Sequence, residues 1–377
     1  MRSNHQFSGE QLRFARLAHG YSLDELGSQV GATRQYIHQL EVGAKPPTAE
    51  MQAALAKALG VQERFFSLGN RSTVRPEQCH FRKRATTPAM VASQVLARGT
   101  LLDVFVETLD AELELPEVSF PDFTANTPEQ VEQAAEGSRD FWGLGHSGPI
   151  LNMTRVAENA GAIVSYFGGV SDRVDALSMD RRRPFILRSE AKPSACRLRF
   201  DIAHECGHLI MHRGVLTGDK ATEDQANRFA SAFLLPRRAF LAEFPRSRNL
   251  DWSAIFDLKL RWKVSARAII RRAYDLGILS SDQYRTGNIH LNKTGQSKKE
   301  RYDGIMPPEA PELLETSFQA LEFNRPGAVA SLAERVGFGA AMFEVILGRS
   351  FPAPGPSYEG SNVYRLFADP ETPPPDL

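Results

Sequence analysis

The sequence has few cysteines, no excess of charge of either sign and no long uncharged apolar run. Its 377 residues include three scattered cysteines, Cys79, Cys196 and Cys206, which fits a reducing cytoplasm and excludes a disulfide framework. Basic and acidic residues number 45 each, so any DNA binding must come from a local surface and not from a global field. Because no signal peptide or membrane span is visible, the sequence predicts a soluble cytoplasmic protein with no membrane partner.

The helix and strand patterns predict an α+β chain that is mostly helical and that divides into five parts. The parts are a five-helix domain over residues 1–68, a basic connector with one long helix over 69–115, a mixed domain with a small sheet over 116–245, a helical or winged-helix-like unit over 246–305, and a C-terminal extension with a mobile Pro-rich tail over 306–377. The sequence indicates no role for the last part. The connector is basic between residues 71 and 84, and it either contacts DNA phosphates or is a plain solvated linker.

The five residues His204-Glu205-Cys206-Gly207-His208 carry the strongest chemical signal. In a helix, positions i and i+4 lie on one face, so His204 and His208 can hold one metal ion together. Glu205 can then take a proton from a water bound to that ion. The flanking residues are apolar, which predicts a buried helix in which unpaired histidines would be costly. The alternative is a surface helix with two unrelated histidines.

A catalytic metal site needs a third protein ligand and one open position. Two carboxylates, Glu223 and Asp224, lie close downstream at the start of a predicted helix. Their residue type suits zinc, but spacing alone leaves the choice between them open.

The motif and its surroundings resemble the ImmA/IrrE family of metallo-endopeptidases. The similarity extends over about residues 140–240, and its segments are 148–150, 175–178, 197–212 and 223–236. The resemblance implies a zincin-like domain with its active-site motif on a helix. It implies His204, His208 and Glu223 as ligands of zinc, or of manganese in its place, and Glu205 as the general base. Asn227 lies one turn after Glu223 on the same helix face, which suits a supporting side chain.

Four other residues in or near the motif have side chains that could contribute to the site. His212 lies one further turn along the helix and is interpreted as a pocket residue before a fourth ligand. Asp224 is a second pocket candidate, and Arg197 either binds substrate or pairs with an acid. Cys206 lies on another side of the helix, where packing is favoured over a redox role.

Peptidases of this type commonly bind the substrate as an added strand at a sheet edge. Residues 183–187 are our candidate for that edge. An ordinary core strand is the alternative.

The N-terminal domain resembles the Cro/CI-like (XRE) helix-turn-helix family over about residues 8–68. A capping box at residues 22–25 starts its first motif helix, and Gly31 permits the turn before the second helix. The first residues of that second helix would enter the major groove and read bases. These are Thr33, Arg34, Gln35 and His38. Paired half-sites predict a homodimer on double-stranded DNA, whereas the alternative is a unit for protein contacts.

Together, these features predict a DNA-binding transcriptional regulator fused to a zinc-dependent endopeptidase, located in the cytoplasm and on the nucleoid when bound to DNA. The resemblance implies cleavage of a repressor or another regulatory protein, or of the chain itself, in stress responses or mobile-element control. The sequence leaves open whether the peptidase is constitutively active or latent until activated. One alternative is a non-enzymatic repressor whose peptidase-like domain senses a ligand or metal, and another is an antitoxin-like regulator. Residues 246–305 would be a second binding surface or a packing unit.

Overall fold

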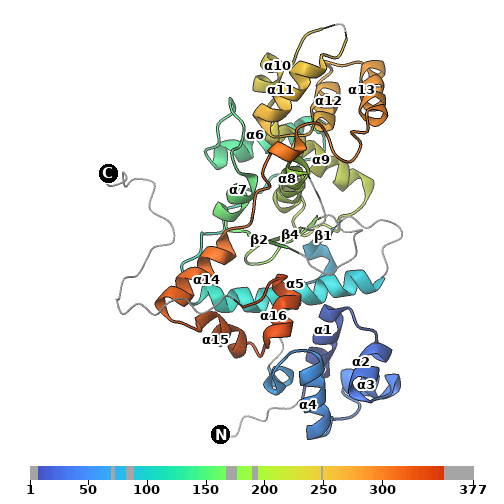
Figure 1. The fold of residues 1–377 in the computed structure, drawn as a ribbon, viewed down its shortest axis with the longest axis vertical. Coiled ribbons are helices and arrows are strands. Elements are labelled where there is room, and N and C mark those ends of the chain that lie inside the picture. Colours follow the sequence, from blue (N-terminus) through green and yellow to red (C-terminus); the bar gives the residue numbers. More distant parts are fainter. Residues whose placement is uncertain are drawn as a thin grey trace.

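The computed structural model describes residues 7–68, 73–81, 89–166, 176–188, 194–247 and 249–351. In it, helices surround one small sheet, with the N-terminal helices at one end of an elongated molecule and α10 to α13 at the other (Figure 1). The expected Pro-rich tail and most of the basic residues in the expected connector lie outside the described residues.

The N-terminal domain contains the expected short helices. They are α1 (Gly9–His19), α2 (Leu23–Val30), α3 (Arg34–Glu41), α4 (Ala49–Ala58) and the 3-10 helix η1 (Glu63–Ser67). The capping box of Ser22 and Glu25 is present, and Gly31 ends α2 in the left-handed conformation with φ of 68°. Arg16 and Glu41 form a buried bidentate ion pair that ties α1 to α3.

The sheet has four strands in the order β1-β3-β4-β2. They are β1 (Cys79–Phe81), β2 (Ile163–Tyr166), β3 (Ala176–Met179) and β4 (Phe185–Arg188). The β2–β4 pair is parallel and the other pairs are antiparallel. Two expectations are corrected here. A strand, β1, lies within the expected connector, and β4 is a central strand, so residues 183–187 cannot be the substrate-binding edge.

The two faces of the sheet belong to two different hydrophobic cores. On one face, Leu177, Met179 and Phe185 pack with the long helix α5 (Ala89–Asp110) and with the N-terminal domain. On the other face, Val164 and Ile186 pack with the helices of the second core. These are α6 (Pro128–Phe141), α7 (Met153–Asn159), α8 (Ala195–Met211), α9 (Lys220–Leu234), α10 (Arg237–Glu243), α11 (Trp252–Trp262) and α12 (Ala266–Asp275).

Helix α5 is long and apolar enough to cross a membrane, but 67% of its most apolar window is buried inside the protein. Its buried residues belong to the first core, so its hydropathy is that of a core helix. It ends at Asp110, before the expected end at residue 115, because the chain turns at Leu109.

The C-terminal helices join the N-terminal domain instead of forming a separate extension. They are α14 (Leu313–Asn324), α15 (Ala328–Arg335) and α16 (Ala340–Leu347), and their apolar faces are part of the first core. An antiparallel bridge between Val61 and Phe338 fixes them to the segment after α4. The rest of the chain adds the 3-10 helices η2 (Pro76–Gln78) and η3 (Asp303–Ile305) and the helix α13 (Ser281–Lys293). The described part of residues 246–305 holds helices alone, which agrees with the helical alternative and not with a winged helix.

Candidate metal centre

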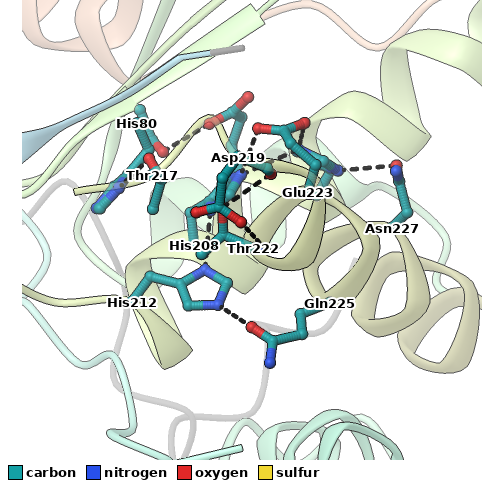
Figure 2. Close-up of polar contacts among 12 residues, drawn as sticks. His80, His208, His212, Thr217, Asp219, Thr222, Glu223, Gln225 and Asn227 are labelled. Carbon is teal, nitrogen blue, oxygen red and sulfur yellow. Dashed lines mark hydrogen bonds and ion pairs between the residues drawn. The ribbon is translucent and has the colours of Figure 1, made fainter. Parts of the chain in front are cut away.

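Two crossing helices, α8 and α9, build the candidate site. The apolar side of α8 is buried in the second core, which leaves His204 and His208 on the side that faces α9. Gly207 allows the two helices to approach closely, since a Cβ there would lie 2.9 Å from the Phe229 ring of α9. This close crossing places Glu223, in the first turn of α9, beside both histidines. Figure 2 shows it next to His208.

His204, His208 and Glu223 bring three donor atoms within 4.8 Å of one another. We call these three residues the metal group. The Nε2 atoms of the two histidines are 3.1 Å apart, and they lie 3.6 and 3.7 Å from the Glu223 carboxylate oxygens. A tetrahedral zinc ion with bonds of about 2.0 Å separates its ligand atoms by about 3.3 Å. Two imidazole nitrogens and a carboxylate at these distances therefore fit zinc without rearrangement.

Hydrogen bonds turn both imidazole rings so that Nε2 faces the group. The Asn227 side-chain oxygen accepts from His204 Nδ1 at 3.0 Å, which leaves His204 Nε2 as an acceptor. Behind His208 runs a longer chain of bonds (Figure 2). Gln225 donates to the Ala125 carbonyl, so its oxygen accepts from His212 Nε2 at 2.8 Å. His212 Nδ1 must then accept from His208 Nδ1, 2.9 Å away, and His208 Nε2 keeps its lone pair.

Burial favours the neutral form of His208 and His212, the two histidines in this chain of hydrogen bonds. It lowers the pKa of His208 to about 3, and it also lowers the pKa of His212. A metal ligand must be the neutral imidazole, so the environment favours the form that binds metal near neutral pH.

Glu205 lies beside the group on α8 and is held by the sheet. Its carboxylate is buried, and the Ser178 hydroxyl of β3 donates to it at 2.6 Å. Ser178 belongs to a segment that supported the family resemblance, but no pattern in the sequence pointed to this bond.

Comparison with known protein families agrees with both halves of this architecture. Residues 157–274 match the M78 peptidase model, described as the IrrE N-terminal-like domain, and residues 9–64 match a helix-turn-helix domain. The chain joins a helix-turn-helix domain to an IrrE N-terminal-like domain. No curated protein matches it. The second match supports a DNA-binding regulator, and the first supports a metallopeptidase-type enzyme that depends on a metal.

One residue beside the metal group of the IrrE N-terminal-like domain was missed in the sequence. His80 of β1 is fully buried, and its ring stacks on that of His208 with centroids 5.3 Å apart. Its Nδ1 is 3.0 Å from the Thr217 hydroxyl. Burial and the nearby His208 and His212 lower the pKa of His80 to about 3. Nothing in the local sequence signals this position, because the pairing of β1 with β3 brings it there.

The other residues considered near the motif lie in different surroundings. Arg197 donates to the Ser297 carbonyl, and this bond links α8 to the segment after α13. Asp224 is exposed and lines a neighbouring pocket, while Cys206 is fully buried in the second core. Burial raises the pKa of the Cys206 thiol, which agrees with a packing role.

All four expected base-reading residues of the helix-turn-helix domain are exposed at the start of α3. Thr33 caps the helix by accepting from the Tyr36 amide, and Arg34 forms an exposed ion pair with Asp24 at 3.2 Å. Gln35 and His38 are exposed beside them, while Ile37 and Leu40 on the opposite side are buried. The helix therefore presents a polar face that is free of core contacts.

Proposed function

We propose that the IrrE N-terminal-like domain is a zinc-dependent endopeptidase with His204, His208 and Glu223 as metal ligands. The observation that carries this proposal is the set of three donor atoms at zinc-like distances, with Glu205 beside them. These three residues would hold zinc, or manganese in its place, and the bound ion would act as a Lewis acid toward the scissile carbonyl and would lower the pKa of water. Glu205 takes the proton of the attacking water and delivers it to the nitrogen of the leaving amine. Ser178 fixes the Glu205 carboxylate for this transfer.

The substrate strand is proposed to lie along β1. This strand is at one edge of the sheet, and it carries His80 directly against His208. An extended peptide that pairs with this edge would pass the metal group, and backbone pairing requires little of its sequence.

The arrangement favours cleavage of another protein over cleavage of the chain's own DNA-binding domain. The helix-turn-helix domain packs on the α5 face of the sheet, whereas α8, which carries His204 and His208, lies on the opposite face (Figure 1). The substrate class that we propose is a repressor or other regulator that is bound to DNA beside a homodimer of this protein. The same cut would relieve repression in a stress response or in control of a mobile element.

Digestion of a proteome-derived peptide library with the zinc-loaded full chain tests the activity directly. New peptide termini should appear with the wild-type chain and be absent after chelation. A library that stays intact in the presence of stoichiometric zinc would support the non-enzymatic alternative, in which the domain senses a ligand or metal.

Zinc affinity should depend on the chain of bonds behind His208. The change His212→Phe keeps a ring but removes the acceptor for His208 Nδ1, and Gln225→Leu removes the group that orients His212. We expect each change to weaken zinc binding by about 10- to 100-fold, measured by competition with a chromogenic chelator. Lys220→Gln, at the exposed start of α9, is the control. Equal affinity in all three variants would contradict a positioning role for His212.

Sequence-specific DNA binding should depend on the first turn of α3. Replacing Arg34 and Gln35 together by alanine removes two side chains suited to bidentate contacts with bases, each worth about 1–3 kcal/mol. We expect a loss of about 100-fold or more in affinity for an operator selected from genomic DNA, measured by fluorescence anisotropy. Lys57→Gln, at the exposed end of α4, should have a much smaller effect. Unchanged operator binding by the double variant would show that α3 is not the reading helix.

A further inference from the structure

A pocket lies next to the metal group, on the far side of the residues that orient its histidines. This pocket has a volume of about 460 Å³ and is formed by the start of α6, by α8 and α9, and by α12 and α13. Asn227 and Gln225, which accept from His204 and His212, are part of its wall. Asn227 contacts the Nδ1 side of His204, whereas the metal group faces Nε2. The pocket is therefore behind the ligand rings and separate from the place where a peptide would be cut.

Arginines outnumber their carboxylate partners around this pocket. Arg272 binds Glu132 through its two terminal guanidinium nitrogens, and Arg271 binds Asp275 at 3.0 Å. Arg228 also lines the pocket, and its guanidinium lies 3.9 Å from the carboxylates of Glu132 and Asp275. Both carboxylates therefore have a closer arginine partner than Arg228. Within the described ranges, its donors make no hydrogen bond.

Arg267 is held in place without being neutralised. Its guanidinium donates to the side-chain oxygens of Asn288 at 2.6 Å and Asn292 at 2.9 Å, both on α13. These partners are uncharged, so they fix the direction of the group and leave its positive charge uncompensated. Asp224 also lines the pocket, but it is exposed to solvent, where its charge is screened.

The rest of the wall combines apolar surface with one unused hydroxyl. Phe200, Val131 and Tyr284 supply the apolar surface. Ser231 is 5% exposed, and its hydroxyl has no hydrogen-bond partner in the part of the chain that the structure describes. A buried polar group without a partner is costly, and a ligand that bonds to it would remove that cost.

We propose that this pocket binds a small organic anion, in which a carboxylate or phosphate group is attached to a flat apolar body. Arg228 and Arg267 bind the anionic group, Ser231 donates to the ligand, and Phe200 and Tyr284 contact the body. Such a charge and shape match the guanidinium preference for planar or tetrahedral oxyanions. The volume is in the range of small-molecule sites. Because the wall is shared with Asn227 and Gln225, the ligand would lie against the residues that position both histidines.

The test is isothermal titration of the full chain with three probes, namely benzoate, adenosine 5′-monophosphate and inorganic phosphate. At least one organic probe should bind with a Kd of about 1 mM or lower, and more tightly than inorganic phosphate. A preference for benzoate or for the nucleotide distinguishes carboxylate from phosphate ligands. Arg228→Gln and Arg267→Gln should each weaken this binding by about tenfold or more.

Arg237→Gln on α10 is the matched control, because this arginine is exposed and outside the pocket lining. Thermal unfolding of each variant confirms that it is folded, and Arg228→Gln carries little risk because its ion pairs are long. Absence of heat with all three probes up to about 10 mM overturns the proposal. So does equal probe affinity in Arg228→Gln and Arg237→Gln. The measurement uses no substrate, so it is independent of whether the metal site cleaves peptides.

Discussion

The change Glu205→Gln is expected to reduce peptide cleavage by about a thousandfold while leaving the zinc content unchanged. General acid–base catalysis by one positioned side chain contributes about 10²- to 10⁴-fold to a rate. An amide cannot take the proton of the attacking water, but it has nearly the same shape as the carboxylate. Its oxygen can still accept from Ser178, so the side chain should remain in place. The three atoms of the metal group are untouched.

The measurement compares initial rates on one peptide from the library digestion, with zinc determined on the same samples. Glu107→Gln is the matched control, because this carboxylate is exposed on α5, at the other face of the sheet. Cleavage by Glu205→Gln at the wild-type rate would exclude Glu205 as the base. Loss of zinc together with activity would instead place Glu205 among the ligands.

The local part of the candidate metal site could be predicted from the sequence, because helix geometry is periodic. The spacing of His204 and His208 places them on one face in any helix, and the family resemblance selected Glu223 over Asp224. The structure puts Glu223 in the group and leaves Asp224 exposed. Asn227 was expected to support Glu223 from the same helix face, but it bonds to His204. The partner of Asn227 depends on the angle at which α8 and α9 cross. The periodicity of one helix does not predict that angle.

The contacts between the sheet and α8 could not be predicted from the sequence, because they also depend on how separate elements pack together. Ser178 approaches Glu205 because β3 packs against α8. His80 approaches α8 only because β1 pairs with β3 in one register, which a short strand among arginines does not reveal. The edge strand was misplaced because an apolar run looks the same at an edge and at the centre of a sheet. Likewise, the helices after residue 312 were identified with no role, since their partners lie some 250 residues earlier in the chain, at Val61 and along α5.

Removal of one metal ligand should abolish zinc binding under ordinary purification conditions. Zinc sites bind with about 10–16 kcal/mol shared among about four ligands, so one ligand contributes about 2.5–4 kcal/mol, or about 60- to 700-fold in affinity. His204→Ala and Glu223→Gln should therefore each contain far less than one zinc per chain by atomic emission after dialysis, whereas the wild type retains about one. His146→Ala is the matched control, since that histidine pairs with Asp140 outside the group.

Thermal unfolding provides a second, independent view of the same site. A ligand that binds only the folded chain stabilises it in proportion to the logarithm of its concentration over its Kd. Chelation should therefore lower the Tm of the wild type and of His146→Ala, and leave the Tm of His204→Ala unchanged. The apo chain should still fold, because α8 and α9 pack in the second hydrophobic core without metal. The bonds from Asn227 and His212 should keep the histidine rings oriented. Full zinc content in His204→Ala would show that the chain binds its metal elsewhere, and the peptidase assignment of this site would then be wrong.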